Sequence, residues 1–415
     1  TFISAGGVTA NNIARYNGAS WSSMGSGTAD EVRAAVAMPN GDLVVAGSFT
    51  NIGGVNANRI ARWNGAMWSP LGTGLNGIVH ALLVLPDGNL IAAGNFLSAG
   101  GRAANRIARW NGSVWSSLGT GLDSGVNALV LLPNGHLVAG GIFSNAGGVS
   151  TSSIARWNGV AWSALGTGVN GSVSALAITP DGKLIAGGSF SIAGGQSASR
   201  VARWDGSTWS PLGTGLEGNV FAFTVLSNGD LVSAGFITSA GGTPVRNIAR
   251  WDGTSWWPLG AGLNSSVNSV ALLPNGDIVA GGMFTRTGTT TVNYIARWDG
   301  SAWSPVGAGV DGIVSLVTVL PSGDLLAGGK FSLASGVVAP YFARASCVTP
   351  ACHSIDFNNN TVFPEDQDVI DFFTVLAGGN CATCSDIDFN NNGVFPEDHD
   401  VIDFFTVLAG GSCGG

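Results

Sequence analysis

Short apolar runs separated by glycine-containing turns dominate the first 346 residues of the chain. In one stretch, residues 126–132 (VNALVLL) form an apolar run, residues 133–135 (PNG) mark a tight turn, and residues 137–143 (LVAGGIF) form a second apolar run. A Gly- and Ser-rich loop leads to residues 154–157 (IARW), and another turn leads to a last short run that begins at Trp162. Apolar runs of this length between such turns are typical of β-strands, so the stretch predicts four antiparallel strands.

The same pattern recurs every 47 residues without insertion or deletion. An apolar residue ends each second strand: Phe2, Phe49, Phe96, Phe143, Phe190, Ile237, Phe284 and Phe331. An arginine lies in each third strand: Arg15, Arg62, Arg109, Arg156, Arg203, Arg250, Arg297 and Arg344. A tryptophan begins each fourth strand: Trp21, Trp68, Trp115, Trp162, Trp209, Trp256 and Trp303. Four-stranded units of this length, repeated seven times, predict an all-β fold, a seven-bladed β-propeller of four-stranded blades over residues 1–346.

The motif of an apolar strand, Gly-Gly, an aromatic residue and a spaced tryptophan resembles the kelch motif. The FTSAGG-type loops, followed by IARWNG and WSxLGTG, are more closely similar to the kelch-like propellers of fungal cortical polarity-marker proteins and of related bacterial surface proteins. The resemblance covers about 345 residues. It implies a propeller fold and says little about activity, because one fold serves many functions.

The third strand occurs in eight copies, one more than the first and fourth strands. We expect the N-terminal third and fourth strands to complete the blade begun by residues 314–331. The last copy, residues 341–344 (YFAR), is then surplus. It is either a strap that leads to the C-terminal region or a strand that pairs with another subunit.

The in-register arginines and tryptophans suggest structure rather than a ligand site. The arginines alternate with tryptophan on a strand that we expect to be buried between blades, and the tryptophans are expected to pack in the core rather than form a carbohydrate platform. Trp157 and Trp162 should face each other as a cross-strand pair. The histidines, expected at the surface, are His80, His136, His353 and His399.

Catalysis requires unlike groups that converge on one point, and near-identical repeats supply few of them. The departures from the repeat are scattered and contain no acid–base set: Arg33, Arg102, Arg106, Phe221, Phe223, Trp257, Arg286 and Tyr294. No Walker loop, GxSxG or HExxH motif is present. The sequence therefore predicts a protein that is not an enzyme.

Charge separates the last 69 residues from the rest. Charged residues are only 10% of the chain, and the first 346 residues carry all 17 Lys and Arg with 14 acids. Residues 347–415 hold 11 acids and no Lys or Arg. Such a segment needs cations for neutralisation, and neither part has the basic stripe of a nucleic-acid-binding protein. No apolar run is long enough to span a membrane.

All five cysteines lie in residues 347–415, which form a tandem repeat of period 32. Each copy begins and ends in Cys, so the natural disulfides are Cys352–Cys381 and Cys384–Cys413. A pairing of Cys352 with Cys384 and of Cys381 with Cys413 stays open, and Cys347 is left over. Disulfides imply an oxidising compartment. Since the chain begins at Thr1 rather than Met, we expect that a leader was removed and that the protein is secreted or lies at the cell surface.

Each copy opens with Asp-x-Asn-x-Asn, which places side-chain oxygens as in an EF-hand calcium loop. The expected ligands of two Ca²⁺ sites are Asp356, Asn358, Asn360, the Val362 carbonyl and Asp368, and Asp388, Asn390, Asn392, the Val394 carbonyl and Asp400. The last Asp falls one position later than in an EF-hand, and apolar residues at helical spacing follow it. The alternative is a disulfide-held loop without an ion. Oxygen ligands without clustered His argue against zinc.

This duplicated loop and helix resembles a dockerin, and especially the dockerin-like repeats of exported planctomycete-type proteins. A small calcium-binding loop–helix domain is thus expected over residues 347–415. The leading hypothesis is an extracellular structural protein that assembles with copies of itself into an oligomer or a filament, because the propeller has few charges and offers a spare strand and a spare cysteine. The alternative is a surface binding module with a glycan or protein ligand on the propeller and the dockerin-like region for anchoring.

Overall fold

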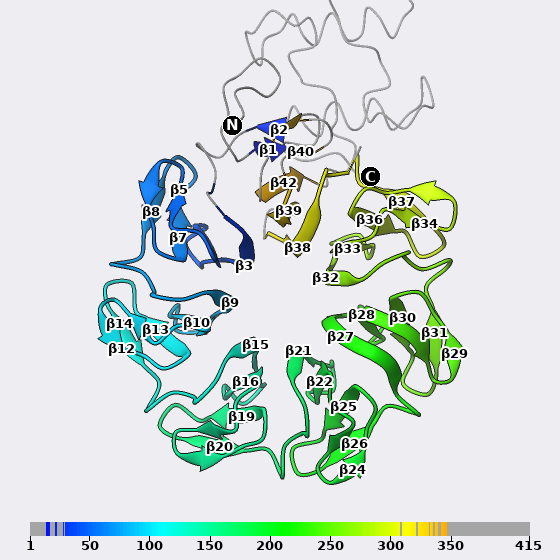
Figure 1. Ribbon diagram of the computed structural model, residues 1–415, viewed down its shortest axis with the longest axis horizontal. Coiled ribbons are helices and arrows are strands. Elements are labelled where there is room, and N and C mark those ends of the chain that lie inside the picture. Colours follow the sequence, from blue (N-terminus) through cyan, green and yellow to red (C-terminus); the bar gives the residue numbers. More distant parts are fainter. Residues whose placement is uncertain are drawn as a thin grey trace, which may run out of the picture. The chain divides into compact units, whose positions relative to one another are not determined.

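A computed structural model describes residues 14–16, 21–22, 28, 30–307, 309–320, 323–331, 333–334, 337–338 and 342–346. The chain divides into two units, Thr1–Ser346 and Cys347–Gly415, and all described residues belong to the first. Every helix or strand in them is a β-strand, arranged as radial sheets around a central axis (Figure 1). Within these residues no helix has the length and hydropathy to cross a membrane. The predicted all-β propeller is confirmed.

Six blades each contain four antiparallel strands in chain order, with the first strand nearest the axis (Figure 1). Blade 1 contains β3 (Val32–Ala37), β4 (Leu43–Gly47), β7 (Ile60–Trp63) and β8 (Trp68–Pro70). Blade 2 contains β9 (Val79–Val84), β10 (Leu90–Gly94), β13 (Ile107–Trp110) and β14 (Trp115–Ser117). Blade 3 contains β15 (Val126–Leu131), β16 (Leu137–Gly141), β19 (Ile154–Trp157) and β20 (Trp162–Ala164).

The second half of the ring repeats this order. Blade 4 contains β21 (Val173–Ile178), β22 (Leu184–Gly188), β25 (Val201–Trp204) and β26 (Trp209–Pro211). Blade 5 contains β27 (Leu216–Val225), β28 (Leu231–Ala240), β30 (Ile248–Trp251) and β31 (Trp256–Pro258). Blade 6 contains β32 (Val267–Leu272), β33 (Ile278–Gly282), β36 (Ile295–Trp298) and β37 (Trp303–Pro305). The register pairs Trp157 with Trp162 at a ring-centroid distance of 5.3 Å, which confirms the predicted cross-strand pair.

The prediction of seven four-stranded blades is wrong, because a different, closing sheet takes the remaining place in the ring. Its order is β2 (Trp21–Ser22), β1 (Ala14–Tyr16), β42 (Phe342–Ser346), β39 (Asp324–Lys330) and β38 (Ile313–Val319). The supposedly surplus strand β42 pairs antiparallel with β39, and β1 pairs with β42 in parallel. The N-terminal strands therefore do not complete this blade as expected, because β42 already occupies the third-strand position beside β39.

A small hairpin in the loop between the second and third strands was not predicted. The hairpins pair β5 (Asn51–Ile52) with β6 (Val55–Asn56), β11 (Ser98–Ala99) with β12 (Arg102–Ala103), β17 (Asn145–Ala146) with β18 (Val149–Ser150), β23 (Ile192–Ala193) with β24 (Gln196–Ser197), β34 (Arg286–Thr287) with β35 (Thr290–Thr291), and β40 (Leu333–Ala334) with β41 (Val337–Val338). In blade 5, β29 (Thr243–Pro244) pairs with the longer β28. Gly147 and Gly148, both with positive φ, form a tight turn of this kind.

The fourth-strand tryptophans join each blade to the one before it. In blade 2, Trp115 is 2% exposed, and its indole N–H donates to the Leu71 carbonyl of blade 1 at 2.9 Å. The same bond recurs from Trp162 to Leu118, Trp209 to Leu165, Trp256 to Leu212 and Trp303 to Leu259. These contacts confirm core packing for the fourth-strand tryptophans, and each satisfied indole N–H contributes about 1 kcal/mol beyond the buried area.

Hydrophobic clusters fill the junctions between neighbouring blades and close the ring. Glycine permits the close approach: a Cβ on Gly140 of blade 3 would lie 2.4 Å from Val173 of blade 4. At the closing junction, Val32 of blade 1 shares a cluster with Leu326 of β39. The blades are thus held face to face by apolar contacts on both sides of each sheet.

The third strands lie between the blades as expected, but their arginine side chains are not fully buried. The third-strand side chains of Arg62 and Arg297 are 49% and 46% exposed, because the long side chain extends past the sheet to solvent. Arg62, Arg250 and Arg297 reach the carboxylate of the Asp that follows the first hairpin turn of the same blade: Asp42, Asp230 and Asp277. Blades 2, 3 and 4 have Asn89, His136 and Lys183 at that position. Their arginines therefore lack this ion pair.

Candidate binding pocket between blades 4 and 5

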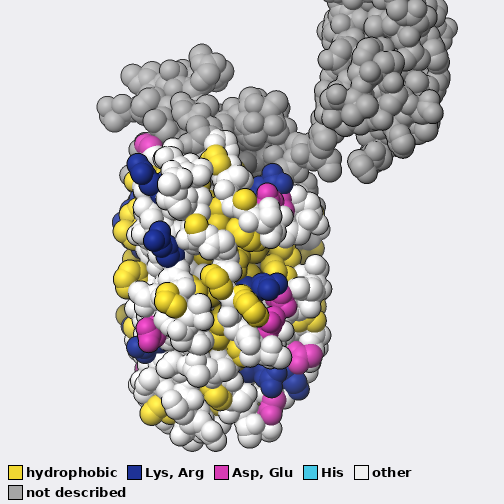
Figure 2. All heavy atoms as spheres, turned by 90° about the vertical axis from the view of Figure 1, so that its right-hand side faces the viewer, with side chains coloured by type: hydrophobic (Ala, Val, Ile, Leu, Met, Phe, Trp, Pro, Cys, Tyr) yellow, Lys and Arg dark blue, Asp and Glu magenta, His cyan; other side chains and the backbone are white. Residues whose placement is uncertain are grey.

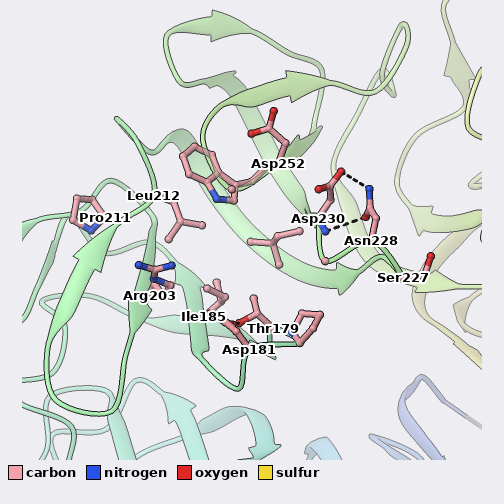
Figure 3. A pocket seen from close by; sticks show the side chains of 15 residues that line it. Thr179, Asp181, Ile185, Arg203, Pro211, Leu212, Ser227, Asn228, Asp230 and Asp252 are labelled. Atoms are coloured by element: carbon pink, nitrogen blue, oxygen red, sulfur yellow. Dashed lines mark hydrogen bonds between the residues drawn. The ribbon is translucent and has the colours of Figure 1, made fainter.

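A cavity of about 470 Å³ lies between the first hairpin turn of blade 4 and the turns of blade 5 (Figure 3). Thr179 and Asp181 come from the β21–β22 turn, and Arg203 from β25. Asp230 lies at the end of the β27–β28 turn, and Trp251 ends β30. Ile185, Pro211 and Leu212 add apolar surface. Because both turns lie at the same end of their blades, the pocket is a notch between two adjacent sheets.

The pocket occurs where the repeat loses a large side chain. The residue before the Pro of the first hairpin turn is Met38, Leu85, Leu132, Leu226, Leu273 or Leu320 in the other units, but Thr179 in blade 4. The equivalent Leu132 packs against the apolar cluster between blades 3 and 4. The corresponding cluster between blades 4 and 5 has no hydrophobic residue from this turn position, because Thr179 occupies it. The shorter, polar side chain thus leaves space that leucine fills elsewhere.

The other side of the pocket carries a second departure. The first residue of this turn is proline in six units, namely Pro39, Pro86, Pro133, Pro180, Pro274 and Pro321, but it is Ser227 in blade 5. Ser227 and Thr179 both line the same cavity. At this junction, two apolar residues of the repeat, a leucine and a proline, are therefore replaced by the smaller polar residues Thr179 and Ser227. Neither residue is among the departures predicted from the sequence.

Hydrogen bonds hold the carboxylates around the pocket in place. The Thr179 hydroxyl donates to Asp181, and this bond lowers the pKa of Asp181. Asp230 Oδ2 accepts from Asn228 Nδ2 at 3.0 Å and from Arg250 Nη1 at 3.0 Å. Figure 3 shows Asp230 and Asn228 joined in this way at one side of the pocket. The side chains are therefore preorganised before a ligand arrives.

Asp252 is fully engaged in its own turn. It accepts hydrogen bonds from the backbone N–H groups of Ser255 and Thr254, from the Thr254 hydroxyl, and from the Trp257 indole N–H at 2.6 Å. These donors, with the Ser255 N–H contributing most, lower the pKa of Asp252 far below its usual range. Asp252 thus shapes the rim as a fixed anion.

Arg203 is the cationic residue of the lining and has free hydrogen-bonding capacity. It is exposed, and none of the ion pairs among the described residues includes it. The equivalent arginines of blades 1, 5 and 6 are neutralised by Asp, whereas blade 4 has Lys183 at that position. The guanidinium group can therefore donate several hydrogen bonds to a ligand.

A second polar cluster lies at the inner edge of the ring, where blade 1 meets the closing sheet. Glu31 is 5% exposed and accepts from Arg33 Nη2 at 2.7 Å and from the Ser315 hydroxyl, and Lys330 Nζ lies 3.8 Å away. In blade 2, Asn95 bonds to His80 at 3.0 Å. Burial first, and then the charge of Arg33, lower the pKa of His80.

This cluster corrects one expectation. His80 is half-buried rather than a surface residue, because the packing of blade 2 against blade 1 brings it close to Arg33 and Glu31. The sequence conceals the contacts with His80 and Ser315, because residues 47 positions apart become neighbours only when adjacent blades pack, and residues 284 positions apart only when the ring closes. Glu31 bonds to Ser315 across that distance, so the cluster serves ring closure.

The predicted calcium and disulfide residues lie outside the described residues: Asp356, Asn358, Asn360, Val362, Asp368, Asp388, Asn390, Asn392, Val394, Asp400, Cys352, Cys381, Cys384 and Cys413. The same holds for Cys347, His353 and His399. Two calcium sites and two disulfides therefore stay predictions.

Comparison with known families supports the fold. Residues 108–261 match the model of the Rax2 C-terminal beta propeller domain. Residues 39–65 and 85–112 match a beta-propeller domain of unknown function, DUF5122. Among curated proteins nothing matches. The expected resemblance is thus confirmed at the level of the β-propeller.

Solved structures with a similar fold include extracellular domains of bacterial signalling proteins. The extracellular domain of a one component system from B. thetaiotaomicron is 12% identical, with a TM-score of 0.55, over 85% of this chain and 41% of that chain. That of a hybrid two component system from the same organism is 10% identical, with a TM-score of 0.50, over 78% of this chain and 41% of that chain. The WD40 beta propeller domain of Doa1 is 16% identical, with a TM-score of 0.50, over 73% of this chain and 90% of that chain.

The chain spans about two fifths of the length of the two bacterial extracellular domains. At these identities the likeness shows the fold alone. The chain therefore shares the β-propeller fold, which occurs in proteins with many different functions.

Proposed function

We propose that this chain is a binding module of the cell surface or the extracellular space, and that its ligand occupies the pocket between blades 4 and 5. The observation that carries the proposal is the coincidence of Thr179 and Ser227 at one junction of an otherwise regular repeat. Departures from a consistent structural pattern are expected at functional sites. A concave, partly apolar site of this volume with a few fixed polar groups is typical of small-ligand binding.

Two further observations agree with this proposal. The similar bacterial structures are extracellular domains of one- and two-component signalling systems, which agrees with an extracellular location of the propeller. The confinement of all cysteines to residues 347–415 supports an extracellular location through the expected disulfides. The expectation that the protein is not an enzyme stays a prediction.

Self-association, the leading expectation from the sequence, stays a hypothesis. On the side of the ring shown in Figure 2, charged side chains are few, and neutral polar and hydrophobic atoms cover most of the described surface. This composition suits neutral contacts between copies but identifies no interface. The pocket supports a binding function, so we favour binding over assembly.

The pocket is tested by restoring the repeat. A library of saccharides, peptides and small metabolites is screened by NMR, with the Thr179 methyl and Trp251 indole signals as reporters. We expect at least one class of ligand to perturb these signals, and Thr179→Leu to abolish its binding measured by calorimetry, because leucine refills the cavity. Leu226→Ile, at the repeat-related position of blade 5, is the control. A library without any hit at these signals, or equal affinity in Thr179→Leu, refutes the assignment.

We also propose that residues 347–415 bind two Ca²⁺ ions. The support is the acidic sequence without Lys or Arg and the repeated Asp-x-Asn-x-Asn spacing. Removal of calcium with a chelator should lower the melting temperature of this region and leave that of the propeller largely unchanged. Replacement of Asp388 and Asp400 by Ala should remove one ion. A stoichiometry of two in that variant, measured by isothermal titration, contradicts the assignment.

A further inference from the structure

We infer that the ligand of the pocket is a neutral saccharide, held by hydrogen bonds from Arg203 and to the carboxylates of Asp181 and Asp230. This inference rests on the proposed binding function and names its ligand class. The charge balance, the free hydrogen-bonding groups and the apolar wall of the pocket support it.

The charges around the pocket cancel. Three carboxylates line it, namely Asp181, Asp230 and Asp252. Arg250 forms an ion pair with Asp230, Arg203 lines the pocket, and the charges of Arg203 and Lys183 both act on Asp181 and lower its pKa. The lining itself thus carries one cation and three anions, and the two neighbouring cations, Arg250 and Lys183, offset the difference. A ligand with a net charge would bring an uncompensated charge into this balance, so a neutral ligand is favoured.

The groups with free capacity are both donors and acceptors. Within the described residues, the hydrogen bonds of Asp230 and Asp181 use Oδ2 of the first and Oδ1 of the second, which leaves one oxygen of each carboxylate for a ligand. The Arg203 side chain supplies donors on the opposite wall (Figure 3). A hydroxyl group both donates and accepts. Neighbouring hydroxyls on a sugar ring can therefore satisfy Arg203 and the carboxylates at the same time.

Apolar surface lies next to these polar groups. Trp251, Leu212, Ile185 and Pro211 form part of the lining. The Trp251 ring lies over Gly213, where an added Cβ would be 3.1 Å from the ring. The C–H face of a sugar ring packs on such a surface while its hydroxyls point to the polar edge. The volume of 470 Å³ equals that of roughly fifteen water molecules, enough for about one or two sugar rings.

The experiment measures binding of chemically matched disaccharides to the full chain by isothermal titration and saturation-transfer NMR. The neutral probes are cellobiose, maltose and N,N′-diacetylchitobiose. The charged probes are digalacturonic acid and chitobiose without its acetyl groups. We expect a neutral disaccharide to bind more tightly than either charged probe.

Arg203→Ala should weaken the binding of the neutral probe about tenfold or more, because a hydrogen bond from a charged donor is lost. The matched control is Arg109→Ala in blade 2, where Asn89 stands at the repeat position of the pairing Asp and the arginine is not part of the lining of the pocket between blades 4 and 5. We expect this control to bind as the unaltered protein does.

The outcomes distinguish a failure of the saccharide inference from a failure of the proposed binding function. Tighter binding of a charged probe, or an equal effect of Arg203→Ala and Arg109→Ala, overturns the saccharide inference and leaves the binding function standing. The same holds if no saccharide binds while a peptide or metabolite from the ligand screen perturbs the Thr179 methyl signal. A pocket that no probe of any class perturbs overturns both.

Discussion

The junction between blades 4 and 5 and the junction between blades 3 and 4 come from the same repeat, but the first has a pocket and the second is filled. Leu132 packs against the cluster between blades 3 and 4, whereas Thr179 leaves space at the equivalent position. Trp251 lines the pocket and is half-buried, as are most tryptophans that end a third strand, and Trp204 at the filled junction is the buried exception. A difference of a few side chains thus converts a packing contact into a candidate site.

The open junction is nevertheless well anchored elsewhere. Phe223 of blade 5 packs against Gly187 of blade 4, where a Cβ would lie 2.4 Å from its ring. The equivalent residue at the filled junction is the smaller Leu176. Apolar volume is therefore gained near the axis and lost at the hairpin turn. The comparison shows that a repeat protein can carry a cavity without loosening the contact between blades.

The largest expected effect on stability comes from the buried Trp256, and its exposed neighbour Trp257 should contribute little. Trp256→Ala should lower the free energy of unfolding by about 3–5 kcal/mol, because a buried indole and its bond to the Leu212 carbonyl are lost. Trp257→Ala, at a side chain that is 49% exposed, should cost less than about 1 kcal/mol. Chemical denaturation measures both. Equal losses would show that the open junction is not held like the others.

A reciprocal exchange at the two junctions should have a moderate effect. Leu132→Thr should lower the free energy of unfolding by about 1–3 kcal/mol, because it opens a gap in a packed junction. Thr179→Leu should leave stability unchanged or raise it by up to about 1 kcal/mol, since it adds apolar contact and loses the hydroxyl bond to Asp181. Thermal and urea unfolding of the two variants tests the asymmetry. Similar losses in both would mean that the pocket is needed for packing.

The smallest effect concerns the titration of Asp181. Its lowered pKa means that the folded state binds the proton less tightly than the unfolded state, so this contribution to stability is present above the unfolded-state pKa and is lost as the pH falls through the folded-state value. Thr179→Leu removes the main cause and should return the pKa toward its usual value. Carboxyl-carbon NMR at acidic pH measures the change. An unchanged pKa would assign the lowering to Arg203 and Lys183 instead.

The repeat predicted most of the fold, because periodic apolar runs and turns determine strands locally. The pocket was harder to foresee. Thr179 and Ser227 are ordinary residues for a turn, and their significance appears only when each repeat position is compared and adjacent blades are placed side by side. The signal existed in the sequence as the replacement of leucine and proline in consecutive units.

Ring closure could not be predicted for a different reason. Residues 14–16 and 342–346 carry the same third-strand motif, so local sequence gives no ranking between them as partners of β39. The exposure of the arginine side chains was not predicted, because the alternation along a strand indicates which sheet face a residue occupies but not how far a long side chain extends past the edge. Calcium and disulfides rest on sequence spacing alone.

The parallel pairing of β1 with β42 gives the closing sheet two copies of the third strand of the repeat. Ala14 lies opposite Ala343 and Arg15 opposite Arg344, so the two ends of the propeller unit present the same residues of the repeat in matching register. Since β39 pairs with β42 and β38, and β1 joins the sheet only through β42, trimming of the first residues by a protease should leave the circle intact. An architecture that usually depends on both termini would thereby tolerate the loss of one.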